Sequence, residues 1–183
     1  MEVFVTFLLN LIYISATLAL IALGLAMVFG LLGVMNMAHG EFVMLGAYSV
    51  YVVQLAGQHF LWAIPVAIVI CVMVGWLMEW LVVRHLYSRP FDTLLATWGV
   101  AILIRKGVEV IFTRDYKSVN QVMPGTIDLL GVSYPAYRLL LVALIIVLFV
   151  ALFTWYQKSK AGLKIRAMVQ GPELAAAVGI DTA

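Results

Sequence analysis

Charged side chains are scarce in this sequence of 183 residues. Asp, Glu, Lys and Arg together make up 11% of it, hydrophobic residues make up 65%, and the mean hydropathy is +1.10. A typical soluble domain is about half apolar and about a quarter charged, so a packed core cannot hide this much apolar surface. The formal net charge of +2 is too small to indicate nucleic-acid binding. We therefore predict an all-α, polytopic transmembrane helical bundle.

Several chemical motifs are also absent. Cys71 is the only cysteine, which excludes an intrachain disulfide and a cysteine-built zinc site. The sequence has no GxxxxGK(S/T) loop for ATP phosphates, and no HExxH or GxSxG motif for hydrolysis. We accordingly predict no catalytic residue, no metal and no cofactor in this chain. The N-terminus lacks the basic start of a cleavable signal peptide, so we expect the first apolar run to remain in the protein.

The apolar residues fall into five stretches, and a helix needs about 20 such residues to cross a bilayer. We place spans near residues 8–34, 42–56, 61–83, 93–112 and 139–155. A mixed loop occupies residues 113–135. Residues 1–156 would form the transmembrane region and residues 157–183 a cytoplasmic loop. An odd number of spans followed by an open loop is typical of a chain that stops partway, so we expect an N-terminal fragment of a longer membrane protein.

The distribution of Lys and Arg predicts the orientation in the membrane. One set of loops carries Arg84, Arg89, Lys158, Lys160, Lys164 and Arg166. The opposite set carries Arg114, Lys117 and Arg138. Because the richer side is cytoplasmic by this rule, the N-terminus and the loop at 113–135 are predicted to lie outside.

A polar insert at residues 36–41 (NMAHGE) separates the first apolar run from a short one. The short run suggests a discontinuous helix that starts inside the membrane, as helices lining transporter pathways do. The alternative is an ordinary cytoplasmic turn, in which Asn36 caps the next helix and Glu41 favours its N-terminal dipole. One His and one Glu are too few for a metal site. The sequence leaves both interpretations open.

Ionisable residues within predicted spans are candidates for function. Glu79 lies between Trp76 and Trp80, which place it near the interface, where it can reach water or pair with a basic neighbour. Arg105 and Glu109 are spaced for pairing on one helix face. For Arg105, a place on a solute pathway and a role as interfacial anchor fit the sequence equally well.

A second candidate site lies near the C-terminus. Glu173 follows a Gly-Pro pair typical of a helix start, and Gly179 is a natural stop after residues 174–178. Such a short helix of small residues buries little by itself, so we expect it to dock on another protein. The alternative is a helix resting on lipid headgroups, assisted by Lys164 and Arg166.

Three runs closely resemble the permease subunits of branched-chain amino acid ABC importers: residues 24–30 (GLAMVFG), 36–42 (NMAHGEF) and 44–48 (MLGAY). Residues 86–90 (LYSRP) and 93–99 (TLLATWG) are more similar to the urea-transporting subgroup. Two departures bear on the substrate: a tryptophan follows Glu79 where an arginine is common, and a charged Arg-Lys pair at 105–106 replaces uncharged residues.

The resemblance extends to the C-terminal region, where residues 162–167 (GLKIRA) are similar to the cytoplasmic loop that engages the ATPase in such permeases. It implies a multi-pass permease in the bacterial inner membrane that imports urea or a branched-chain amino acid. The implied substrate pathway contains Asn36, His39, Glu41, Thr97 and Trp98. The implied ATPase-coupling residues are Glu173, Ala175, Ala176 and Gly179.

The partners that the resemblance implies are a second permease subunit, cytoplasmic ATPase subunits that consume the ATP, and a periplasmic solute-binding protein. Membrane lipid surrounds the assembly, and no nucleic acid is involved. A passive channel or secondary transporter for a small polar solute is the alternative, because the spans contain polar residues. A membrane-embedded enzyme would need a nucleophile or metal set that the sequence lacks.

Overall fold

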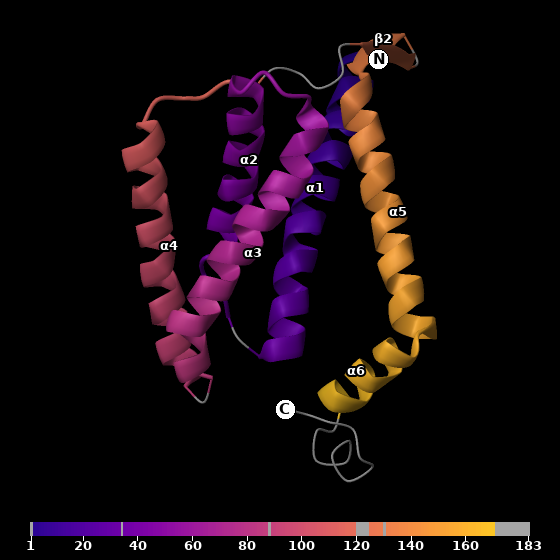
Figure 1. Ribbon diagram of the computed structural model, residues 1–183. Coiled ribbons are helices and arrows are strands. Elements are labelled where there is room, and N and C mark those ends of the chain that lie inside the picture. Colours follow the sequence, from indigo (N-terminus) through magenta and orange to yellow (C-terminus); the bar gives the residue numbers. More distant parts are fainter. Residues whose placement is uncertain (1, 34, 88, 120–124, 130, 171–183) are drawn as a thin grey trace. The chain divides into compact units, whose positions relative to one another are not determined.

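The computed structural model describes residues 2–33, 35–87, 89–119, 125–129 and 131–170 (Figure 1). The chain divides into two compact units, Met1–Leu31 with Met123–Ala183, and Leu32–Val122. Among the described residues, three helices are long and apolar enough to cross a membrane: Glu2–Gly30, Phe60–His85 and Ala136–Lys158. The predicted α-helical transmembrane fold is confirmed. The other two predicted spans, near residues 42–56 and 93–112, stay predictions.

The first unit begins with α1 (Glu2–Leu32), a continuous helix of 31 residues. The helix begins before residue 8, where the first predicted span starts. No charged residue follows Glu2 within α1, so nothing in its sequence favours a break. Gly33, which has a φ of +65°, comes directly after α1, and a glycine in this left-handed conformation is a common helix stop.

The predicted mixed loop contains a β-hairpin that sequence reasoning missed. Strands β1 (Thr126–Leu129) and β2 (Val132–Pro135) pair antiparallel, with Ile127 opposite Tyr134. The strands are only four residues each, too short to show an alternating pattern that separates them from a loop. The hairpin leads directly into α5 (Ala136–Lys158).

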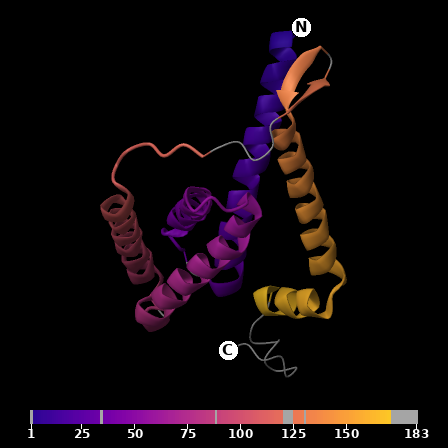
Figure 2. The same cartoon turned by 45° about the horizontal axis from the view of Figure 1, so that its top comes forward.

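Helix α6 (Lys160–Gln170) follows α5 after the single residue Ser159 and turns sharply away from it (Figure 2). This helix was not predicted, because its high Lys and Arg content resembles that of a solvated loop. The helix predicted at 174–178 lies outside the described residues.

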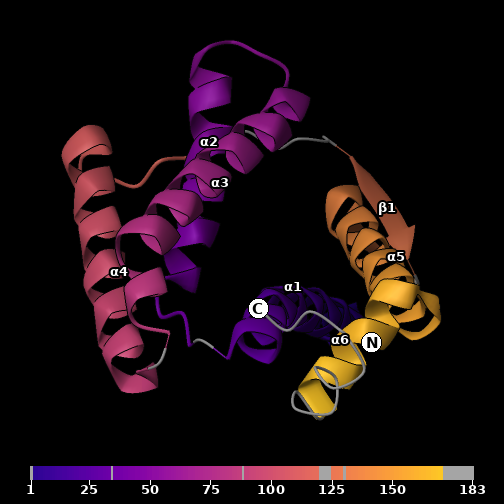
Figure 3. The same cartoon turned by 60° about the horizontal axis from the view of Figure 1, so that its bottom comes forward.

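The second unit contains three longer helices: α2 (His39–Leu55), α3 (Ala63–Leu81) and α4 (Pro90–Phe112). Short 3-10 turns, η1 (Phe60–Trp62) and η2 (Val83–His85), precede and follow α3. Figures 1 and 3 show α3 crossing α2 obliquely. The two helices meet where Cys71 Sγ lies 3.7 Å from the Phe42 carbonyl oxygen and the ring of Phe42 packs against Gly75.

Most large apolar side chains of the described helices point outward. Phe7 in α1, Leu103 in α4 and Val147 in α5 are 63%, 72% and 67% exposed. In water such an exposed apolar surface would cause aggregation, whereas in a bilayer it is in contact with the lipid acyl chains. The few buried residues of the second unit include four polar side chains, all in α2 or α4.

Candidate functional site at the start of helix α2

The buried polar side chains in the described part of the chain are Glu41, Ser49, Thr93 and Thr97. All four belong to α2 or α4, the two helices that follow polar segments of the sequence. The Ser49 hydroxyl donates to the Leu45 carbonyl of its own helix at 2.8 Å, and the Thr93 hydroxyl lies 2.7 Å from the Leu86 carbonyl and 3.0 Å from the Arg89 carbonyl, both before α4. Glu41 and Thr97 connect α2 and the segment before it with α4.

The insert before α2 is held by its own side chains. Asn36 Oδ1 accepts a hydrogen bond from the Ala38 N–H at 2.9 Å, and the Asn36 carbonyl accepts from the His39 N–H at 3.3 Å. This is an Asx turn, which mimics a backbone turn with the side chain of asparagine. Asn36 therefore shapes the entry to α2 but is not its N-cap, which is the fully buried Ala38.

Thr97 joins the insert to α4. Its Oγ1 accepts from the Met37 N–H at 3.2 Å and donates to the Leu94 carbonyl at 3.0 Å, with the Met35 carbonyl 3.4 Å away. The side chain is completely buried. A backbone N–H outside a helix needs a partner when water is excluded, and Thr97 supplies it.

Glu41 and Arg105 form an ion pair between α2 and α4. Arg105 Nε donates to Glu41 Oε1 at 3.1 Å, and Arg105 Nη2 donates to the same oxygen. The predicted pairing of Arg105 with Glu109 is therefore wrong. Glu109 accepts from Lys106 at 2.7 Å and from Arg114 at 3.2 Å. Arg105 prefers Glu41 because that carboxylate is buried and has the greater need for a charged donor.

Helices α2 and α4 run parallel with a large offset. Glu41 meets Arg105, and the ring of Tyr48 lies 4.8 Å from that of Phe112, so both pairs have the same sequence separation. At 1.5 Å per residue, α2 begins about 20 Å along α4. Figure 1 shows the same offset, with α2 starting partway along α4.

This offset distinguishes between the two interpretations of the insert. A turn at the membrane surface would place the ends of α2 and α4 at the same level. Here the backbone at residues 35–38 is non-helical and runs beside α4, where Thr97 holds it. The offset favours the discontinuous-helix interpretation, and the position of the insert within the membrane stays a prediction.

The other predicted pathway residues lie around this junction. His39 is half-buried in the first turn of α2, whereas Trp98 is 58% exposed on the outside of α4. The structure thus brings Asn36, Glu41 and Thr97 together and leaves Trp98 apart from them. The predicted coupling residues Glu173, Ala175, Ala176 and Gly179 lie outside the described residues.

The region around Glu79 in α3 has a different character. The rings of Trp76 and Trp80 stack 6.1 Å apart, and the guanidinium of Arg84 lies over the ring of Trp80 at 5.3 Å. Within the described residues Glu79 makes no ion pair. Burial, and then the charge of Glu79, raise the pKa of Tyr87, which lies outside the predicted span. These contacts fit the predicted position of Glu79 at an interface.

Sequence reasoning missed a polar cluster in the first unit. Arg138 Nη1 in α5 donates to Asn10 Oδ1 in α1 at 2.7 Å, and the guanidinium lies over the ring of Tyr13 at 5.1 Å. Tyr134, which is buried, donates to the same oxygen at 3.2 Å. An asparagine alone within a charge-free run was the available signal, since such a side chain needs a partner in an apolar environment.

The fold and the ion pair between α2 and α4 define a polytopic α-helical membrane protein with a polar junction between helices. The chain matches the family model for the branched-chain amino acid transport system / permease component over residues 7–183. The chain belongs to this family of membrane permeases.

The curated relatives bear related names. The high-affinity branched-chain amino acid transport system permease protein BraD of Pseudomonas aeruginosa is 24% identical over 190 residues, covering 96% of this chain and 62% of that protein. The corresponding protein LivH of Salmonella typhimurium is 25% identical, covering 94% and 61%. A probable LivH of Methanocaldococcus jannaschii is 25% identical, covering 91% and 55%. The chain therefore spans about three fifths of these relatives' length, and no solved structure matches it.

Proposed function

We propose that this protein is the permease subunit of an ATP-driven importer in the bacterial inner membrane and that solute passes the junction between the insert and α4. The permease family supports transport as the activity, with ATP hydrolysed in a separate subunit. The observation that carries the location of the pathway is the start of α2 beside the middle of α4, secured by Glu41 and Arg105.

The physical argument is that lipid does not tolerate such a junction. Non-helical backbone at membrane depth persists only where protein or a water-filled cavity surrounds it. An ionisable pair in the same place is expensive unless it faces a polar path. The Arg105 side chain is 61% exposed in this chain, so a polar pathway is the environment that suits it best.

The chemistry of the pair suits a small polar solute. A carboxylate and a guanidinium side by side offer hydrogen-bond acceptors and donors of opposite charge. A branched-chain amino acid, which is a zwitterion, would match both charges, and the relatives' names favour this substrate. Urea, which needs only paired donors and acceptors, is the second candidate, because residues 86–90 and 93–99 resemble the urea-transporting subgroup.

The partners follow from this proposal. A second permease subunit would supply the rest of the pathway wall, and a periplasmic binding protein would deliver the solute. The segment containing Glu173, Ala175, Ala176 and Gly179 would engage the cytoplasmic ATPase, as its resemblance implies.

The mode of transport is tested by uptake of labelled solute into proteoliposomes that contain the assembled transporter. Uptake is expected only when ATP and the binding protein are both present. Flux without nucleotide would identify a passive channel or secondary transporter instead. Replacing Glu173 or Gly179 should lower the ATP hydrolysis that the binding protein stimulates, and unchanged hydrolysis would contradict the coupling role.

The substrate is tested by competition in cells that carry the complete transporter. If the solute is a branched-chain amino acid, labelled leucine is taken up and excess urea has no effect. If the solute is urea, labelled urea is taken up and excess leucine has no effect. Uptake of neither would contradict both candidates.

A further inference from the structure

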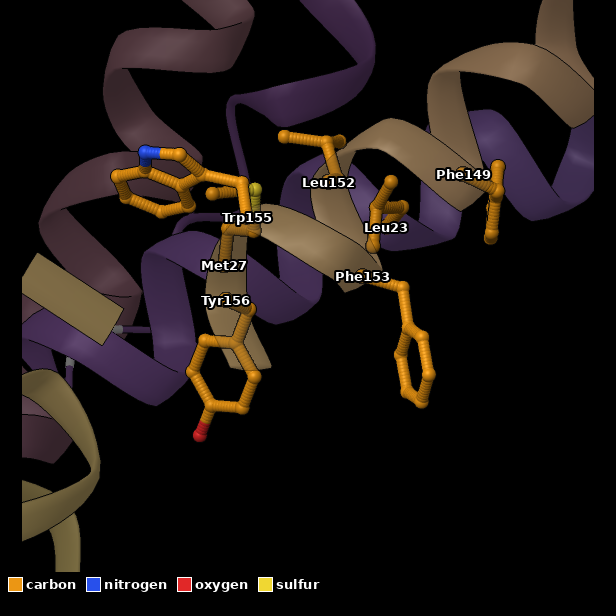
Figure 4. A pocket seen from close by; sticks show the side chains of 7 residues that line it. All are labelled: Leu23, Met27, Phe149, Leu152, Phe153, Trp155 and Tyr156. Carbon is orange, nitrogen blue, oxygen red and sulfur yellow. The ribbon is translucent and has the colours of Figure 1, made fainter. Parts of the chain in front are cut away.

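An apolar groove runs between α1 and α5 in the first unit (Figure 4). Leu23 and Met27 of α1 form one wall, and α5 forms the other with residues such as Phe149 and Leu152. Its volume is about 230 Å³, and almost no polar atom lines it. The groove is therefore apolar, with Phe149 at one end and Tyr156 towards the other (Figure 4).

The end marked by Tyr156 carries concentrated positive charge. Within a few residues the chain has Lys158, Lys160, Lys164 and Arg166. No acidic residue occurs in the sequence between Asp128 and Glu173, and none of the ion pairs of the described residues involves these four cations. This cationic cluster therefore lacks a counter-charge from the described part of the chain.

Tyr156 connects the groove with the basic segment that follows it. Tyr156 lines the groove, and the guanidinium of Arg166 lies over its ring at 5.4 Å. Arg166 Nη2 also donates to the Gln157 carbonyl at 3.1 Å, which fixes the guanidinium near the end of α5. Arg166 therefore lies at the Tyr156 end of the groove.

The bend between α5 and α6 maintains this arrangement. Ser159 Oγ accepts from the Gly162 N–H at 2.8 Å, the pattern of a helix N-cap. A side chain at Gly162 would collide with the carbonyl of Tyr156, so only glycine allows α6 to approach so closely. Because α6 cannot swing away without losing these contacts, Arg166 stays beside the groove.

We propose that this groove binds one anionic glycerophospholipid, with an acyl chain between α1 and α5 and the headgroup phosphate beside Arg166 at the Tyr156 end. The apolar lining matches an acyl chain, and Trp155 and Tyr156 lie where aromatic residues usually meet the headgroup region. Basic residues on an amphipathic helix next to a membrane span are suited to anionic headgroups. A free phosphate would use the cations alone, so the adjoining groove favours a lipid. The proposal does not depend on which solute is transported.

The test uses the protein in nanodiscs made of phosphatidylcholine and phosphatidylglycerol in equal parts, followed by native mass spectrometry of the lipids that remain bound. The protein is expected to retain phosphatidylglycerol over phosphatidylcholine by about tenfold. The variant K160Q/K164Q/R166Q should lose this preference. The matched variant R84Q/R89Q, which removes arginines beside another span, should keep it.

Three results would overturn the proposal. The first is no preference in the unchanged protein. The second is an equal loss in R84Q/R89Q, which would indicate general surface attraction. The third is unchanged retention when Leu23→Trp fills the groove.

A second measurement covers the case in which Leu23→Trp does not fold. The fluorescence of Trp155 is recorded after Phe replaces the other tryptophans, Trp62, Trp76, Trp80 and Trp98. Phosphatidylglycerol with brominated acyl chains should quench it more strongly than brominated phosphatidylcholine. Equal quenching would show that no anionic lipid is selected, and an apolar helix of another protein would then be the better occupant.

Discussion

Glu41 and Arg105 form an ion pair whose two members lie in different environments. The Glu41 side chain is 7% exposed, whereas that of Arg105 is 61% exposed. Glu41 also lies in the first turn of α2, where a negative charge interacts favourably with the helix dipole. The carboxylate is therefore largely enclosed by the protein, and the guanidinium is the more accessible member of the pair.

This asymmetry predicts unequal effects of the two neutral substitutions. Arg105→Gln leaves a buried carboxylate without its charged donor and should lower stability measurably. Glu41→Gln leaves an exposed guanidinium that can find other acceptors, so its effect on stability should be smaller. The stability of both variants is measured by thermal unfolding of the detergent-solubilised protein, with fluorescence-detected size-exclusion chromatography as the readout.

Lys106→Gln is the control, since Lys106 is the exposed neighbour that pairs with Glu109. It should change stability little, as surface ion pairs contribute about 0–1 kcal/mol. Equal destabilisation by Arg105→Gln and Lys106→Gln would contradict the description of Glu41 as a buried carboxylate that depends on Arg105.

The hydroxyl of Thr97 is predicted to hold the insert in place. Thr97→Val keeps the shape of the side chain but leaves the Met37 N–H without its acceptor, at a cost of about 1–3 kcal/mol. Thr97→Ser keeps the hydroxyl and should be close to the unchanged protein. Hydrogen exchange at Met37 should accelerate in Thr97→Val only, and equal exchange in both variants would contradict the bond.

The five predicted helices are all present because each rests on a strong local signal, a long apolar run ended by polar residues or glycine. Their bounds differ by a few residues, since polar groups such as Glu2 and Lys158 continue a helix at no great cost once it is formed. The β-hairpin and α6 were missed for the opposite reason. The strands are too short to show a periodic pattern, and α6 has a high Lys and Arg content that resembles a solvated loop. Their contacts with Asn10 and Tyr156 depend on the tertiary structure and on the close approach at Gly162.

The candidate site was predictable in composition but not in pairing. Asn, His and Glu within one short insert indicated a polar junction, and the structure does place Asn36 and Glu41 there. The partner of Glu41 lies 64 residues away, and local spacing favoured Glu109 as the partner of Arg105. Only the offset between α2 and α4 brings the distant pair together.

The bend between α5 and α6 is predicted to depend on two small residues. Ser159→Ala removes the cap of α6 and should lower local stability by about 1 kcal/mol. Gly162→Ala should do more, because the added methyl group meets the Tyr156 carbonyl. Hydrogen exchange of the α6 amides should be faster in both variants. Unchanged exchange in Gly162→Ala would contradict the close approach.

The orientation predicted from Lys and Arg can be tested by labelling. In a Cys71→Ala background, Lys117→Cys should react with a membrane-impermeant maleimide in spheroplasts, whose outer membrane has been removed. Lys164→Cys should react only after the membrane is opened. Labelling of Lys164→Cys in intact spheroplasts would reverse the orientation and place α6 outside the cytoplasm.

The most direct test of the proposed pathway is protection of a cysteine at the start of α2 by the solute. In the Cys71→Ala background, His39→Cys within the assembled transporter is treated with a small maleimide, with and without saturating leucine or urea, whichever the cells take up. Gln58→Cys, in the exposed turn before α3, is the control. The account predicts that solute slows modification at position 39 and leaves position 58 unchanged. Modification of His39→Cys at the same rate with and without solute, or no modification at all, would contradict it.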